Sequence, residues 1–392
     1  MIITIPARAM RFKLIPGMIC TICFASIALA DSLSAAELRG TWLTTTANTA
    51  IATPQNTAAT MRRLQDIGIN TVYVECWKNG YTEFPSPTMN AAIGVPMRIN
   101  PSIKGQPALQ RDLLAECVAE AHKNHLACVA WFEYGFMAAY RDTHNELRAR
   151  HDWLSLNQQG GDVAKNGFVW LNPLHPDAQN LLIGIITDAI KAHDLDGIQL
   201  DDRLAWPSLE MGYDDYTKAA YAHEHNGQAP PPDVKDPEWC RWREQKVTEF
   251  SQRLIAAIRA VNPHIAISLS PGPYPWARDN YLCNWPAWSG WDQFVPQCYR
   301  LDYIGFEKIW HDQLAAIGNH KHDLIAGIRI TGDGPNLSWL DLQKSIELTR
   351  STGAGGHCLW FSHGVLDVYP DQLKAFYHGF IPSPLRPAKL EH

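Results

Sequence analysis

Carboxylate side chains end several short apolar runs in this sequence. The run 197–201 ends in Asp201, and Asp202 follows it directly. Glu133 and Glu75 stand at or near the ends of two earlier runs of the same kind. Cleavage of a glycosidic bond needs two carboxyl groups: a protonated one that donates to the leaving oxygen, and an ionised one that attacks the sugar or activates water. Clustered carboxylates raise the pKa of one member, as an acid catalyst requires.

The Asp201–Asp202 pair is the most specific of these patterns. Because side chains alternate along a strand, one carboxylate of the pair points into the site and the other points aside. A helix cap or an ion pair with Arg203 is the structural alternative. We assign the nucleophile or base to Asp201 or Asp202 and the proton donor to Glu133. The second choices for the donor are Glu75 and Asp302.

Other polar and aromatic side chains near the ends of apolar runs suit sugar binding. Planar polar groups hydrogen-bond hydroxyls, and aromatic rings stack on the apolar faces of sugar rings. The chain has 15 Trp against 13 Tyr and 12 Phe, an excess that fits such contacts, although core packing is the commoner role of any single Trp. The side chains expected to contact substrate are Arg39, Trp77, Trp206, Gln297, Tyr299, Arg300, Asp302 and Trp360.

Eight strand-like runs alternate with amphipathic helical stretches along the chain. Such alternation predicts parallel βαβ units, and eight of them over about 330 residues fit a (β/α)₈ TIM barrel better than an open sheet. No G-x-G-x-x-G or P-loop motif opens a helix, which disfavours a nucleotide-binding fold. The expected strands are 38–44, 70–76, 127–133, 197–201, 265–270, 291–299, 324–330 and 357–361, and the expected helices are 56–66, 108–123, 176–193, 238–261, 306–317 and 338–352.

Two connections are far longer than the usual few residues. They are the segments 134–175 and 203–237, after the third and fourth strands. Connections that follow strands lie at the C-terminal face of a barrel, where barrel enzymes build their active sites. The long loops are therefore expected to surround the carboxylates.

The N-terminal segment is typical of a secretory signal peptide. Arg8, Arg11 and Lys13 precede the apolar run 14–30, and the small residues of Ala28-Leu29-Ala30 suit a cleavage site. The alternative is an uncleaved anchor, but a run of 17 residues with Pro and Gly inside it is shorter than the roughly 20 that span a bilayer comfortably. We expect cleavage near Ala30 or Ala36 and export to the periplasm or the medium.

The remainder reads as one catalytic domain, 37–380, and a loose Pro-rich tail, 381–392. No later stretch is long and apolar enough to span a membrane. The net charge of −6 disfavours binding of nucleic acid or anionic lipid. The oligomeric state stays open.

Metal and cofactor chemistry find little support in the sequence. The end of the first strand lacks the H-x-H of amidohydrolase barrels, and no H-E-x-x-H or G-x-S-x-G motif is present. Seven cysteines follow the expected cleavage site at wide spacings without a C-x-x-C. We interpret them as small buried side chains, with a disulfide open as the alternative in an oxidising compartment. We expect no cofactor and no metal.

Short motifs are spread over the chain from about residue 37 to residue 360. They include ELRGTW at 37–42 and DGIQLDD at 196–202. The others are the segments 70–73, 77–86, 170–173, 211–214, 268–271 and 296–300. Together these motifs resemble the glycosyl-hydrolase-like family 10. The resemblance implies a (β/α)₈ barrel, bacterial export and hydrolysis of glycans, with cell-wall glycan strands as a substrate class.

The run that ends in Asp201 is also similar to the corresponding strand of amylase-type barrels. In those enzymes the Asp at this place is the nucleophile and the acid follows the fifth strand, where this chain has Ser270. Two alternatives to a glycosidase therefore remain open. One is a non-catalytic glycan-binding barrel that has lost its acid–base pair, and the other is an acyl or amide hydrolase with a carboxylate-held metal.

Overall fold

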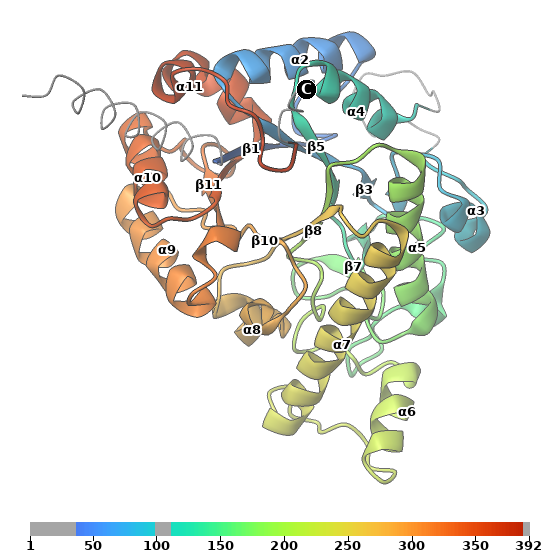
Figure 1. The fold of residues 1–392 in the computed structure, drawn as a ribbon. Helices are drawn as coiled ribbons and strands as arrows, with labels where there is room; N and C mark the ends of the chain where they lie inside the picture. The colour runs from blue at the N-terminus through green and yellow to red at the C-terminus, as the bar shows by residue number, and fades with distance from the viewer. Residues whose placement is uncertain (1–36, 99–110, 387–392) are drawn as a thin grey trace, which may run out of the picture.

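The computed structural model describes residues 37–98 and 111–386, and its centre is an eight-stranded parallel barrel (Figure 1). The sheet order is β10-β9-β8-β5-β2-β1-β12-β11. Parallel bridges from Phe294 to Leu324 and from Gln297 to Gly327 join the two ends of the sheet and nearly close it. The strands are β1 (Leu38–Leu43), β2 (Thr71–Glu75), β5 (Ala127–Phe132), β8 (Gly197–Asp201), β9 (Ala266–Ser270), β10 (Gln293–Phe294), β11 (Ile325–Arg329) and β12 (Gly356–Trp360). The predicted (β/α)₈ barrel is confirmed.

Helices surround the barrel and begin where the sequence provides caps. Side chains of Thr53, Asp236 and Ser338 accept hydrogen bonds from backbone N–H groups in the first turns of α2, α7 and α10. Proline occupies a first-turn position in α2, α5 and α7, where its missing N–H costs nothing. The surrounding helices are α2 (Pro54–Ile67), α4 (Leu113–Lys123), α5 (Pro176–Ala192), α7 (Pro237–Val261), α9 (Tyr303–Ile317), α10 (Trp339–Ser351) and α11 (Pro370–Tyr377).

The sixth strand is much shorter than the sequence suggests. The run 291–299 was expected to be a strand, but only Gln293–Phe294 pairs as β10. Pro296 has no N–H to continue the ladder, and beyond it the chain is joined to its neighbours by the bridge from Gln297 to Gly327 and by the Gln297 N–H, which donates to the Pro271 carbonyl. The chain after β10 therefore leaves the regular ladder, and the Gln297 side chain reaches Asp201 at the barrel mouth.

The long connections carry additional structure above the C-terminal ends of the strands. The hairpin β3 (Trp77–Lys78) and β4 (Tyr81–Thr82) and helix α3 (Pro87–Ile93) follow β2. The hairpin β6 (Met137–Tyr140) and β7 (Phe168–Trp170) follows β5. Helix α6 (Asp215–Glu224) follows β8, and α8 (Trp276–Tyr281) follows β9. Figure 1 shows α6 beside the first turns of α7, projecting beyond the ring of helices.

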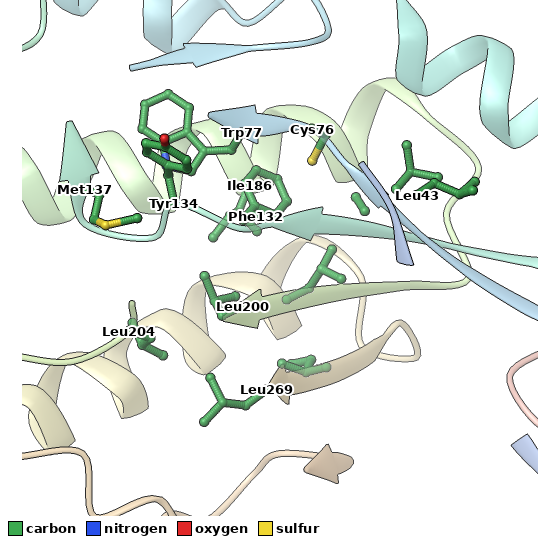
Figure 2. Close-up of a cluster of buried hydrophobic side chains, with 14 of the residues drawn as sticks. Leu43, Cys76, Trp77, Phe132, Tyr134, Met137, Ile186, Leu200, Leu204 and Leu269 are labelled. Atoms are coloured by element: carbon green, nitrogen blue, oxygen red, sulfur yellow. The ribbon is translucent and has the colours of Figure 1, made fainter. Parts of the chain in front are cut away.

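The core has two layers on opposite sides of the sheet. Figure 2 shows part of the outer layer, to which Phe132, Leu200 and Leu269 belong, one from each of three neighbouring strands. Side chains alternate along a strand, so Trp131 and Asp201 point the other way, into the barrel, where their side chains hydrogen-bond each other. The outer layer thus fixes which carboxylates face inward.

Residues 381–386 are packed against the N-terminal end of the barrel, which corrects the expectation of a loose tail there. The hydroxyls of Ser383 and Thr71 are 2.8 Å apart, and Arg386 makes an ion pair with Asp196 at 2.9 Å. Leu385 packs against the apolar side chains inside the barrel. Residues 387–392 lie outside the described residues.

The predicted signal peptide and the first residues of the expected helix 108–123 also lie outside the described residues. Within 37–98 and 111–386, no helix has both the length and the hydropathy of a membrane span. The seven cysteines of these segments are free, and all except Cys240 are buried.

We predict that Leu385→Ala lowers the free energy of unfolding by about 1–2 kcal/mol, because it removes apolar contacts at the base of the barrel. Urea unfolding followed by circular dichroism measures the change. The control is Leu340→Ala on α10, where the leucine is 58% exposed and the expected change is about 0.5 kcal/mol or less. Equal effects of the two variants would contradict the packed position of Leu385.

Candidate active site

Three carboxyl groups converge at the C-terminal mouth of the barrel. Glu75 ends β2, Glu133 follows β5 and Asp201 ends β8, and these strands are neighbours in the sheet. Two basic side chains lie between the acids: Lys78 contacts Glu75 and Glu133, and Arg203 contacts Glu133 and Asp201. The mouth therefore carries an alternating row of acidic and basic side chains.

Glu75 is buried and held as an anion. Its Oε1 accepts from Lys78 Nζ at 2.6 Å, and its Oε2 accepts from the backbone N–H of Thr45 at 2.6 Å and from the Thr45 hydroxyl. Burial raises the pKa of Glu75, but hydrogen bonding from Glu133 and the charge of Lys78 outweigh it and lower the pKa to about 2. This arrangement disfavours Glu75 as a proton donor.

Glu133 has the opposite electrostatics. Burial and then the negative charge of Glu75 raise the pKa of Glu133 well above its usual range, against the opposing charges of Lys78 and Arg203. A raised pKa favours the protonated form of Glu133, and a protonated Glu133 can donate to Glu75. The two glutamates that contact the same lysine therefore have pKa values shifted in opposite directions, lowered for Glu75 and raised for Glu133.

Asp201 is the centre of a hydrogen-bond network across the barrel. Its Oδ2 accepts from Trp131 Nε1 at 2.6 Å, and its Oδ1 accepts from Gln297 Nε2 at 2.6 Å and from the backbone N–H of Asp202 at 2.7 Å. Burial and then the charge of Asp202 raise the pKa of Asp201 well above its usual range, against the opposing effects of Arg203 and the backbone N–H of Asp202. All of these contacts are with donors, so they orient Asp201 as an acceptor.

Arg203 holds the acids close together. Its Nη1 is 2.9 Å from Asp202 Oδ1, 3.2 Å from Asp201 Oδ1 and 3.8 Å from Glu133 Oε1. The Oδ1 atoms of Asp201 and Asp202 are therefore no more than about 7 Å from Glu133 Oε1, an upper limit that is compatible with the separation of catalytic carboxyl pairs in glycosidases. Asp202 has the most accessible side chain of the three, at 31% against 3% for Asp201 and 14% for Glu133.

An aromatic wall lies on the other side of Asp201. The rings of Tyr299 and Trp360 stack with centroids 5.8 Å apart, and Trp360 also contacts Trp131 and Trp42. Both Tyr299 and Trp360 are partly exposed, so a sugar ring can reach them. Of the expected substrate contacts, the structure brings Gln297, Tyr299 and Trp360 together near Asp201. Arg300 is partly exposed beside Tyr299 and donates to its carbonyl oxygen.

Four expected substrate contacts are placed differently by the structure. Arg39 is the second residue of β1, at the opposite end of the barrel, where it binds Glu37 and the carbonyl of Gly379. Trp77 and Trp206 lie near the mouth but are fully buried. Their indole N–H groups donate to the carbonyls of Gly135 and Met211 inside folded loops. Asp302 is exposed and caps α9 through the N–H of Gly305.

Lys78 and Trp131 are the site residues that sequence reasoning missed, and Arg203 was considered only as an alternative partner of the aspartates. Lys78 follows Glu75 by three residues and Arg203 follows Asp201 by two. A basic residue two or three positions after an acid at a strand end could therefore have indicated the ion pairs of the site. Trp131 gives no such signal in the sequence. It is buried like a core tryptophan, and its hydrogen bond to Asp201 is visible only in the structure.

Within the described residues, no group of three or more His, Cys, Asp or Glu side chains is arranged to hold a metal ion. The acids of the mouth are instead neutralised by Lys78 and Arg203.

We predict that Lys78→Met lowers the free energy of unfolding by about 3–5 kcal/mol, because Glu75 would lose the positive charge that offsets its burial. Urea unfolding at neutral pH measures the loss, and adding Glu75→Gln to the same chain should restore part of it. Lys123→Met, at an exposed pair with Glu120, is the matched control with an expected change of about 0.5 kcal/mol or less. A similar small change in both single variants would argue against the buried pair.

A parallel (β/α)₈ barrel with clustered carboxyl groups and stacked aromatic rings at its C-terminal mouth defines a glycoside-hydrolase-like protein. The family model described as "Glycosyl hydrolase-like 10" matches residues 37–320, and the chain belongs to this family. The resemblance noted in the sequence is thereby confirmed.

Similar proteins agree with this classification. The chain is 23% identical over 323 residues to "Glycosyl hydrolase YngK" of Bacillus subtilis (strain 168), an alignment that covers 73% of this chain and 58% of the relative's length. The glycoside hydrolase domain of PgaB (BpsB) from Bordetella bronchiseptica superposes with a TM-score of 0.64 at 15% identity, over 90% of this chain and 99% of that one. α-L-Fucosidase isoenzyme 2 from Paenibacillus thiaminolyticus superposes with a TM-score of 0.54 at 14% identity, over 87% of this chain and 49% of that one. These two structures share the barrel fold.

Proposed function

We propose that this protein is an exported glycoside hydrolase that cleaves O-glycosidic bonds in a polysaccharide, with bacterial cell-wall glycan as the first substrate class to examine. The observation that carries the proposal is the grouping of Glu133, Asp201 and Asp202 around Arg203 at the barrel mouth. It combines a carboxyl of raised pKa with an aspartate pair no more than about 7 Å away.

Each group has a defined role in this proposal. Glu133 gives its proton to the leaving glycosidic oxygen as the bond from that oxygen to the anomeric carbon breaks. Asp201 or Asp202 attacks the anomeric carbon or takes a proton from an attacking water. Arg203 stabilises the carboxylates in both steps, and Gln297 and Trp131 keep Asp201 oriented.

The substrate class rests on the shape and polarity of the mouth. Tyr299 and Trp360 offer an aromatic surface for the apolar face of a sugar ring. Residues 1–30 have the sequence of a signal peptide, which fits a glycan substrate outside the cytoplasm. N-terminal sequencing of the chain recovered from the periplasm or medium tests export, and an N-terminus near residue 31 or 37 is expected.

We predict that Glu133→Gln lowers kcat about 10²–10⁴-fold, because the leaving oxygen loses its proton donor. Asp201→Asn and Asp202→Asn are tested singly to find which aspartate attacks. The purified chain is incubated with a panel of polysaccharides that includes peptide-free cell-wall glycan, and products are read by mass spectrometry. Asp66→Asn and Glu120→Gln, distant from the mouth, serve as controls that should keep full activity. Unchanged hydrolysis by all three site variants would refute the assignment.

We predict that hydrolysis retains the anomeric configuration. Retaining glycosidases have carboxyl groups about 5–5.5 Å apart, whereas inverting enzymes need about 6.5–9.5 Å to admit a water. The distance between Glu133 Oε1 and Asp202 Oδ1 is at most about 7 Å, which excludes most of the carboxyl separations found in inverting enzymes. Proton NMR of the first product formed distinguishes the two outcomes, and an inverted product would mean that the aspartate pair activates water instead.

We predict a fall in activity as the pH rises through the pKa of Glu133, because the donor must be protonated. Glu75→Gln removes the negative charge that raises this pKa, so the alkaline limb of the kcat/KM profile should move to lower pH by about one unit. Glu120→Gln should leave the limb in place. An unmoved limb in Glu75→Gln would show that another group is the donor.

A glycan-binding barrel without catalysis is the second candidate. It is favoured by Ser270, which stands at the end of β9 where amylase-type barrels carry their acid, and which is 1% exposed. Binding of one glycan in the panel without products from the unsubstituted chain would support this candidate and exclude hydrolysis of that glycan.

A further inference from the structure

A cavity of about 170 Å³ opens beside the barrel mouth, with Asp202 and Arg203 among its lining residues. The hairpin β6–β7 contributes Phe168 and Trp170, and α8 contributes Trp276 and Tyr281. Asp202 therefore faces this cavity as well as the acids of the mouth. The cavity is bounded by the connections that follow β5, β8 and β9, so it belongs to this chain's own loops.

The polar end of the cavity offers one acceptor and one donor. Asp202 Oδ1 is buried, and its close partner among the described residues is the Arg203 guanidinium at 2.9 Å. Asn166 is held in place because its Oδ1 accepts from the backbone N–H of Phe168 at 3.2 Å and from the Trp170 indole at 3.4 Å. One negative and one positive charge sum to zero, so this end suits hydroxyl groups better than a charged substituent.

The remaining walls are aromatic on one side and small on the other. The rings of Trp276 and Tyr281 lie 5.3 Å apart, and Trp276 is 50% exposed although it is a large apolar residue. A Cβ at Gly272 would come within 2.9 Å of the Trp276 ring, so glycine lets this ring lie over the backbone. Ala277 and Cys283 leave the space open. At about 170 Å³ the cavity is below the roughly 300 Å³ of pockets for larger ligands, which limits it to one ring.

We propose that this cavity is a specificity subsite that binds a single uncharged sugar ring next to the bond that is cleaved. Trp276 stacks on the face of the ring, and Asp202 and Arg203 bind its hydroxyl groups. This proposal rests on the proposed glycosidase function, because only a glycosidase cleaves a bond next to the cavity. Sugar binding in the cavity can be measured without catalysis.

The test uses the otherwise full chain with Glu133→Gln, so that bound sugar is not consumed. Tetrasaccharides of neutral hexoses, of N-acetylhexosamines, of uronic acids and of free hexosamines are titrated by calorimetry. We expect an uncharged tetrasaccharide to bind at least tenfold more tightly than the charged ones. Trp276→Ala should weaken that binding at least tenfold, and Ala277→Phe should do the same by filling the cavity.

Tyr216→Ala provides the matched control, because Tyr216 is also a partly exposed aromatic residue but lies on α6 and outside the cavity. The Tyr216→Ala variant should bind the uncharged tetrasaccharide as tightly as the Glu133→Gln chain does. In the chain with Glu133 intact, Trp276→Ala should raise KM about tenfold or more and leave kcat within about threefold.

The outcomes separate the subsite from the catalytic proposal. Binding that is lost in Trp276→Ala, without hydrolysis by the unsubstituted chain, would support the subsite and contradict the glycosidase. Hydrolysis with KM unchanged in both Trp276→Ala and Ala277→Phe would contradict the subsite alone. Tighter binding of a charged tetrasaccharide, or no binding of any of the four, would also overturn it.

Discussion

The barrel mouth holds four carboxyl groups close together, those of Glu75, Glu133, Asp201 and Asp202, and three of them are largely buried. The surrounding structure has to offset the repulsion between these groups. Ionised groups cannot stay in such a place without partners. Lys78 offsets the negative charge on the β2 side and Arg203 on the β8 side, and the pKa values of Glu133 and Asp201 are raised, which favours their protonated forms. The raised pKa that an acid catalyst needs therefore follows from burial and from having two basic side chains for four acids.

The fold supplies this arrangement through the alternation of side chains on neighbouring parallel strands. Phe132 and Leu200 are fixed against the outer helices, so the next residues, Glu133 and Asp201, face the barrel interior. Inside, Trp131 of β5 and Gln297, three residues after the end of β10, complete the environment of Asp201. A change in the outer layer of the core would thus alter the site without touching any of its residues.

The fold was largely predictable from the sequence because the apolar runs and helical stretches alternate with clear boundaries. The expected run 197–201 coincides with β8, and the long helix α7 begins one residue before the expectation. The short β10 shows where the prediction of strands failed. Pro296 lies inside an otherwise strand-like run, and only Gln293–Phe294 pairs as a strand. The acids were found as residues at strand ends. Arg39, Trp77 and Trp206 were placed wrongly, because residue type and proximity to a strand end say nothing of which end a side chain faces or whether a loop covers it.

Residues 381–386 bind the lower end of the barrel through Thr71, Asp196 and the apolar side chains between them. This segment comes after all eight strands in the order of synthesis. The base of the barrel therefore stays uncovered while the rest of the chain emerges, and its closure is the last step available to the folding protein.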